Sequence, residues 1–298
     1  MRTTTYIIRY GFAAVFALLL AGCVKDELHD TPHPDQGVVS VSVDSPQGAE
    51  EDSYTVEVDG KPLDEGDNAS NPLTPGEHTV LVYNTPEGFT VADGIAYVER
   101  VDGPRALAEL INPLPETLYS GTKTVTVMAD DMLRVDLDVA QRTRDLRLEL
   151  TVTEGAPERI AAITGTLSGV AGAYDLRCET LHGEAVSTAP AFTRSGDKVS
   201  AALRLLGTMG EAQVLTLTLT FTDGLTQTVE SDLTEALANF NGDMEQTFTV
   251  TGSLCTPTEA GLGGCTITDW THGGGGSGSA CHGRLLFLRC CQRQCLCP

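Results

Sequence analysis

Two runs in this 298-residue chain have the spacing of a serine nucleophile beside a lysine base. They are Ser120-Gly-Thr-Lys123 and Ser195-Gly-Asp-Lys198. In penicillin-recognising enzymes this motif opens a helix, whereas both runs here are Ser-Gly turns between predicted strands, and the companion motifs are absent. The sequence also contains no Gly-x-Ser-x-Gly elbow, phosphate loop or dinucleotide fingerprint. We therefore expect the protein not to be an enzyme.

Histidines and carboxylates could bind a metal ion, but their spacing does not favour it. His29 and His33 are four residues apart, yet they lie in a proline-containing linker rather than on a helix. Asp64-Glu-Gly-Asp-Asn68 lacks the spaced ligands and the final Glu of a calcium-binding EF-hand, which favours a solvated loop. Asp136 and Asp138 should lie on the same solvent-exposed face of one strand. We therefore predict no metal and no cofactor.

Cysteines are concentrated at the C-terminus, where the composition changes. Five of the nine lie after Ala280 and fit no recognised zinc spacing, although a zinc or disulfide knot is the alternative interpretation. Our hypothesis is that a frameshift in the glycine-coding run makes the sequence after about Ala280 non-native. Resequencing of the gene would test it. Cys255 and Cys265 are candidates for a disulfide, and Cys178 for a small buried residue. The clustered cysteines are Cys281, Cys290, Cys291, Cys295 and Cys297.

The N-terminus has the layout of a secretory signal. Arg2 and Arg9 precede the apolar run 12–21, which is too short for a spanning helix of about 20 apolar residues. The run ends in Leu20-Ala-Gly-Cys23, which resembles the bacterial lipobox. The resemblance implies cleavage between Gly22 and Cys23, diacylglycerol on the Cys23 thiol and acylation of the new amine. An ordinary signal peptide followed by a chance cysteine is the alternative.

Residues 23–37 are predicted to be a lipidated N-terminus and a flexible polar linker. Lys25-Asp26-Glu27 follows the lipid cysteine closely and resembles the surface-export signal of Bacteroidetes lipoproteins. A chance charged tether is the alternative. With the export signal, we expect an outer-membrane protein, held by two or three acyl chains and exposed on the surface.

Composition excludes some partners. Acidic residues outnumber basic ones 41 to 19, for a formal charge of −22, and such a surface repels phosphate backbones. We therefore expect no binding to nucleic acid. Aromatic residues are only 5% of the chain, which is few for a protein that stacks on sugars or bases.

Alternating apolar residues predict an all-β protein of two tandem β-sandwich domains, at 38–142 and 143–265, followed by a glycine-rich linker and tail at 266–298. The strongest hairpin signal is Asp223-Gly224 between two alternating runs. One helix is predicted at 233–240, with Asp232 as its N-cap and Glu235 completing a capping box.

A family resemblance is carried by the lipobox with Lys25-Asp26-Glu27 and by the segments 75–84, 139–148, 166–169, 216–241 and 267–270. Together they resemble the FimB/Mfa2 family of fimbrial subunits from Bacteroidia. The resemblance implies two transthyretin-like β-sandwich domains in a lipid-anchored protein that forms the base of a fimbrium or limits its length. Its partners would be fimbrial subunit proteins, joined by β-strand addition, and its setting cell adhesion.

Two other functions compete with this interpretation. A glycan-binding surface lipoprotein of a polysaccharide-uptake system would normally present several aromatic side chains, and the mature chain has a single Trp, Trp270. A lipoprotein hydrolase would need a nucleophile or metal set that the sequence does not show. Neighbouring fimbrillin-like genes would favour the fimbrial role, and a polysaccharide transporter gene would favour the glycan binder.

Overall fold

The computed structural model describes residues 34–46, 54–63, 72–101, 110–257 and 264–272, and it confirms the all-β prediction. No helix among these residues is long and apolar enough to cross a bilayer. The elements are β1 (Val38–Asp44), β2 (Thr55–Val58), β3 (Lys61–Pro62), β4 (Gly76–Tyr83), β5 (Phe89–Ala92), β6 (Ile95–Val98), β7 (Arg100–Val101), β8 (Leu110–Ile111), β9 (Tyr119–Val127), β10 (Met132–Asp138), β11 (Ala140–Gln141), β12 (Arg144–Glu154), the 3-10 helix η1 (Pro157–Arg159), β13 (Ile160–Asp175), β14 (Thr180–Thr188), β15 (Thr193–Ser195), β16 (Lys198–Leu205), β17 (Val214–Phe221), β18 (Thr226–Asp232), β19 (Phe248–Cys255) and β20 (Thr266–His272).

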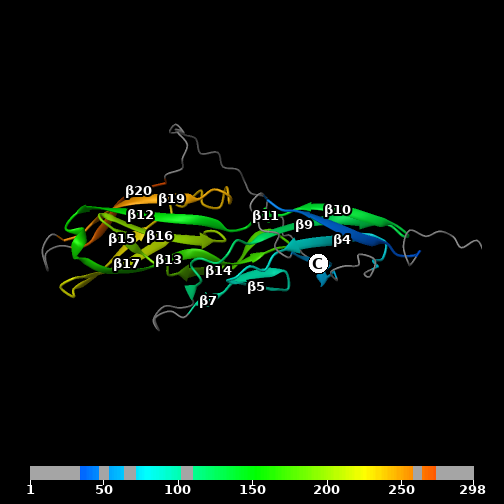
Figure 1. Ribbon diagram of the computed structural model, residues 1–298, viewed down its shortest axis with the longest axis horizontal. Coiled ribbons are helices and arrows are strands. Elements are labelled where there is room, and N and C mark those ends of the chain that lie inside the picture. The colour runs from blue at the N-terminus through cyan, green and yellow to red at the C-terminus, as the bar shows by residue number, and fades with distance from the viewer. Residues whose placement is uncertain (1–33, 47–53, 64–71, 102–109, 258–263, 273–298) are drawn as a thin grey trace, which may run out of the picture.

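One end of the elongated molecule is built from β1–β4 and β9–β11, which we call the first body (Figure 1). Its five-stranded sheet has the order β11-β9-β4-β2-β3, and β1 pairs with β10 in parallel. Alternation in these strands turns one set of valines inward, because successive side chains point to opposite faces. The core they form includes Val39, Val80, Val82, Val127 and Val135.

The other end, which we call the second body, contains β5–β8 and β12–β20 (Figure 1). One sheet has the order β15-β16-β12-β19-β20 and the other β18-β17-β13-β14-β8-β7. Leucines at alternate positions of β12, β16 and β17 are buried and fill the core shared by the two sheets.

Strands β5–β8 depart from the predicted domain boundary. Although residues 89–111 precede position 142 in sequence, β6 pairs with β13 and β8 pairs with β14. Phe89, Ala96 and Ile111 also pack in the second core. Assigning all of residues 38–142 to one N-terminal sandwich is therefore wrong for this segment, because its pairing partners lie more than 70 residues away in the chain.

The predicted C-terminal linker also begins too early. Residues 266–272 form β20, which extends the sheet beside β19. The Trp270 indole donates a 2.7 Å hydrogen bond to Ser231 Oγ, and its ring lies against Gly252, where a Cβ would come within 2.8 Å of it. Only the later part of the predicted tail, 273–298, lies outside the described residues.

Segment 233–240, predicted as a helix, forms consecutive turns instead. Its backbone bonds are mixed, with Leu237 N–H donating to Leu233 but Phe240 N–H donating to Leu237. Asp232 still caps the segment by accepting from the Thr234 N–H at 2.8 Å. Eight residues give little helical stability of their own, so burial of the apolar side chains decides the backbone path.

Local turn chemistry was predicted more successfully. β17 and β18 form the expected antiparallel hairpin around Asp223-Gly224, and Gly224 has a φ of 84°, which glycine adopts at little cost. The Asp223 carboxylate accepts from the Leu225 N–H and from Arg159.

Candidate functional site

The residues predicted to matter are scattered rather than assembled. Gly22, Cys23, the acidic loop at 64–68 and the clustered C-terminal cysteines lie outside the described residues. Ser120 lies within β9 rather than in a turn, is fully buried, and accepts a hydrogen bond from Arg142 Nε. Ser195, by contrast, does end at a Gly196 turn between β15 and β16. Asp136 and Asp138 are exposed at alternate positions of β10, as predicted.

The proposed Cys255–Cys265 disulfide is absent from the structure, where both residues are free thiols. Cys265 Sγ donates to Gln227 Oε1 at 2.9 Å, whereas Cys255 Sγ lies 3.5 Å from Thr153 Oγ1. Burial raises the pKa of the Cys265 thiol, which disfavours the reactive thiolate. The spacing of the two cysteines suggested a bridge, but each side chain has a separate partner.

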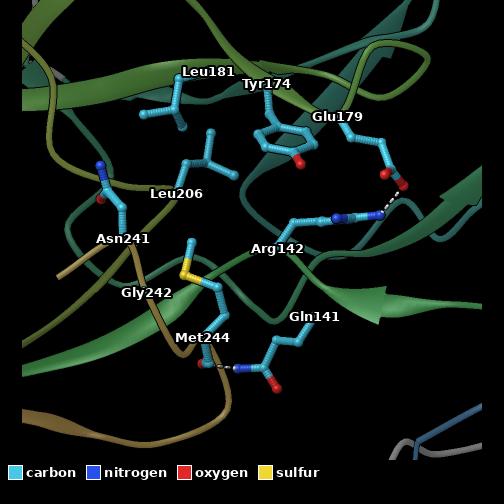
Figure 2. Close-up of a pocket in the computed structure, with 9 residues that line it drawn as sticks. All are labelled: Gln141, Arg142, Tyr174, Glu179, Leu181, Leu206, Asn241, Gly242 and Met244. Carbon is cyan, nitrogen blue, oxygen red and sulfur yellow. Dashed lines mark hydrogen bonds and ion pairs between the residues drawn. The ribbon is translucent and has the colours of Figure 1, made fainter. Parts of the chain in front are cut away.

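A hollow of about 330 Å³ lies where the two bodies meet (Figure 2). Arg142 is its central charge, paired with Glu179 and lying 5.6 Å from the centroid of the Tyr174 ring. Arg142 Nη2 also donates to the Ser120 carbonyl at 3.0 Å. Because the cation already has these partners, the hollow is suited to holding the bodies together rather than to binding an anion.

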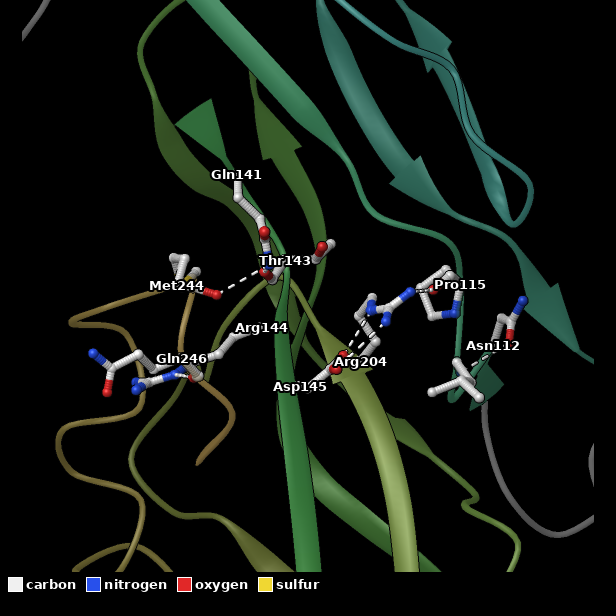
Figure 3. Close-up of polar contacts among 10 residues, drawn as sticks. Asn112, Pro115, Gln141, Thr143, Arg144, Asp145, Arg204, Met244 and Gln246 are labelled. Atoms are coloured by element: carbon white, nitrogen blue, oxygen red, sulfur yellow. Dashed lines mark hydrogen bonds and ion pairs between the residues drawn. The ribbon is translucent and has the colours of Figure 1, made fainter. Parts of the chain in front are cut away.

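Beside it, Arg144 forms a buried clamp (Figure 3). Its guanidinium donates to the carbonyl of Gln246 at 2.7 Å and to those of Asn239 and Phe240. The cation also lies 4.8 Å from the centroid of the Phe248 ring. Burial lowers the pKa of Arg144, and Asp243 opposes that shift. The clamp therefore fastens the turns at 239–246 to the start of β12.

Two further arginines make polar links in this region, and one of them reaches the first body. Arg204 on β16 forms an ion pair with Asp145 and donates to the Pro115 carbonyl (Figure 3). Arg177 donates to the Asp93 carbonyl at 2.6 Å and reaches Glu57 on β2 at 3.5 Å. These links were not predicted. The sequence did indicate that Arg144 would be buried. It lies an even number of residues before the inward-facing leucines of β12, so its side chain points to the same face of the strand.

His78 and Asp59 form a second polar pair, within the first body. His78 Nδ1 lies 2.6 Å from Asp59 Oδ2, and Nε2 lies 2.7 Å from the Thr74 carbonyl. Both neighbours are acceptors, so the arrangement favours a protonated ring. Burial lowers the pKa of His78, but these two hydrogen bonds and the Asp59 charge raise it overall. For Asp59, burial raises the pKa, but hydrogen bonds from the Thr79 N–H and His78 lower it overall.

This pair predicts a pH dependence of stability. A raised histidine pKa stabilises the fold fully below about pH 6.5, and the contribution disappears as pH rises through the folded value. The lowered Asp59 pKa contributes above about pH 4 and is lost as pH falls. We therefore expect the melting temperature of the first body to fall between pH 6 and pH 8.5, and less so in His78→Gln. The exposed His182→Gln is the matched control. Identical pH profiles for wild type and His78→Gln would contradict this.

Sheet edges are the remaining candidates for a binding site in the described part of the chain, which contains no group of three or more His, Cys, Asp or Glu side chains that could hold a metal. The terminal strands β3, β11 and β15 have only two or three residues, which limits unwanted pairing. Strands β18 and β20 contact each other through Ser231 and Trp270. Among the residues that the structure describes, a longer unpaired edge remains on the first half of β13.

Comparison with known proteins gives a consistent result. Residues 50–272 match the sequence model of the fimbrillin-A associated anchor proteins Mfa1 and Mfa2. The solved fimbrial anchor protein Mfa2 from Porphyromonas gingivalis is similar, with a TM-score of 0.53, 14% identity and coverage of 80% of this chain and 97% of that one. A candidate adhesin from Bacteroides ovatus has a TM-score of 0.54 at 14% identity, covering 80% of this chain and 96% of its own. A search of curated proteins finds no match.

Proposed function

Because this chain belongs to the family of fimbrillin-A associated anchor proteins, we propose that it is a lipid-anchored outer-membrane subunit that holds or assembles a fimbrium. The match to the family over residues 50–272 carries the proposal. The all-β fold supports it, since a strand-rich body suits a protein that transmits tension between a membrane and a filament.

The membrane attachment in this proposal is the acylated Cys23. One acyl chain binds a bilayer weakly, whereas two or three hold a protein stably. Residues 24–37 then connect the lipid to the start of β1, and fourteen residues can span at most about 45–50 Å when extended. The first body would therefore stand nearest the membrane, with room for surface display.

The attachment to the fimbrium is proposed to be β-strand addition. An unpaired strand edge presents a row of backbone N–H and C=O groups, and a strand from a neighbouring subunit can bond to them. The edge of β13 supplies such a row in the described part of the chain. This mode of binding needs no catalytic group and no cofactor.

Mechanical shearing of fimbriated cells tests the anchor role. We expect the shaft subunits to enter the supernatant and this protein to stay with the outer-membrane fraction. Deleting the gene should release intact fimbriae into the medium, and restoring it should return them to the cells. If the protein left with the sheared shaft, or if deletion left attached fimbriae unchanged, the anchor role would be wrong. Binding to a glycan array instead would favour the polysaccharide-uptake alternative.

A further inference from the structure

Strand β13 changes partners half-way along its length. On one side it pairs with β17 over residues 160–167, then contacts Gly207 and Met209, and finally pairs with β6. On the other side it pairs with β14, but only over residues 167–175. Among the described residues, nothing pairs with positions 160–166 on that second side. Since backbone groups of an antiparallel strand point alternately to its two sides, every second residue there offers an unpaired N–H and C=O.

The cause of this open edge is the end of β14. The last pair of the β13–β14 ladder is Leu167 with Thr188, and the chain continues as Ala189-Pro190. Proline has no N–H to donate to a ladder, and it restricts the residue before it. The chain then crosses to the other sheet, where Thr193 begins β15. Among the described residues, no strand therefore occupies the place beside residues 163–166 that a longer β14 would fill.

A hollow of about 620 Å³, which we call the β13 groove, lies beside this edge. It touches both faces of the sheet, because its lining includes Ile163 and Gly165, which alternate along β13 with Thr164 and Thr166. The Phe192 ring lies over Gly165, where a Cβ would come within 2.8 Å of it. Contact with both faces is expected of a missing strand rather than of a hollow in one face. The groove is lined by Leu110, Ile163, Thr164, Gly165, Thr166, Ala189, Pro190, Ala191, Phe192, Thr216 and Thr218.

The lining residues carry no charge, although the chain as a whole has a formal charge of −22. A charged occupant would lose its hydration there without gaining a partner. Small and β-branched side chains on the occupant would pack well against the alanine, threonine, isoleucine and proline side chains that line the groove. The unpaired backbone row requires an occupant that offers N–H and C=O groups at the spacing of an extended chain, about 3.3 Å per residue.

We propose that the β13 groove accepts an extended, uncharged segment of a neighbouring fimbrial subunit, which adds as a strand along residues 163–166. This inference rests on the proposed function and deepens it by naming the accepting edge. Backbone hydrogen bonds to β13 supply the affinity, and alternate side chains of the incoming strand enter the apolar space between Phe192 and Leu110.

Photo-crosslinking on intact, fimbriated cells tests this proposal. A photo-reactive amino acid is placed at position 164 in the full chain, and at position 226 as the control, since both are exposed threonines on strands of the same sheet. We expect position 164 to cross-link to an uncharged segment of a fimbrial subunit, identified by mass spectrometry, and position 226 not to do so. Hydrogen exchange should also show protection of residues 163–166 in the isolated complex.

Matched charge substitutions give a second measurement. Thr164→Lys places an unpaired cation in the groove and should reduce the amount of subunit retained on the cell about tenfold or more. Thr226→Lys adds the same charge two strands away and should retain the wild-type amount. If position 164 gave no cross-link and Thr164→Lys were harmless while fimbriae stayed anchored, the groove would be the wrong acceptor and the anchor role would survive. If the protein never associated with fimbriae, both proposals would fail.

Discussion

Cys23→Ser is expected to abolish incorporation of labelled palmitate and to remove the protein from the outer-membrane fraction. Serine keeps the size of the side chain but has no thiol to receive diacylglycerol, so cleavage before position 23 and acylation of the new amine would also fail. Losing the only proposed lipid attachment removes the free energy that holds the body to the bilayer, about 0.8 kcal/mol for each buried CH₂ group.

Cys178→Ser is the matched control for this experiment. Cys178 is a half-buried thiol in the second body that forms no disulfide, so its replacement should leave both labelling and fractionation unchanged. Palmitate label that persisted in Cys23→Ser, or continued sedimentation with the outer membrane, would show that the protein is held in another way.

Arg144→Ala is expected to destabilise the second body by about 3–5 kcal/mol, the largest effect we predict for a residue remote from the lipid. Arg144 is only 6% exposed and serves three backbone carbonyls between Asn239 and Gln246. Truncation would leave these acceptors buried and unsatisfied, and it would also remove the cation from the faces of Phe240 and Phe248. Equilibrium unfolding in urea measures the loss, and hydrogen exchange should rise first in residues 239–246.

Two variants separate the clamp from general effects of losing a charge. Arg147→Ala removes an exposed arginine from the same strand and should change stability by less than about 0.5 kcal/mol. Arg144→Lys keeps the charge but cannot donate in a planar fork, so it should recover only part of the loss. Equal unfolding midpoints for Arg144→Ala and wild type would show that the clamp adds nothing to stability.

Local patterns predicted the strands well because their causes lie within a few residues. Alternation from Val214 to Phe221 buries every second side chain, and Asp223-Gly224 supplies the turn that returns the chain as β18. Reasoning from local sequence gave a wrong prediction at 233–240. A capping pattern was present there, but burial of Leu233, Leu237 and Phe240 determined the backbone path. A short helical signal is weak beside the burial of large apolar side chains.

Pairing between distant segments could not be predicted in this way. Nothing near residues 89–111 indicates that β6 and β8 join β13 and β14, and nothing in Val38–Asp44 indicates its parallel pairing with β10. These contacts depend on which edges remain free once the rest of the chain has folded. The buried position of Arg144, by contrast, could have been suspected from its parity with Leu146 and Leu148.

The proposed lipid attachment at Cys23 is determined entirely by the sequence, because processing enzymes recognise a short contiguous motif that need not be folded. The proposed acceptor edge is not, even though Ala189-Pro190 marks where β14 must stop. An open edge exists only when β17 has already paired with one side of β13 and β14 has left the other. Backbone groups are alike in every residue, so their availability depends on which distant strands have already bonded to them.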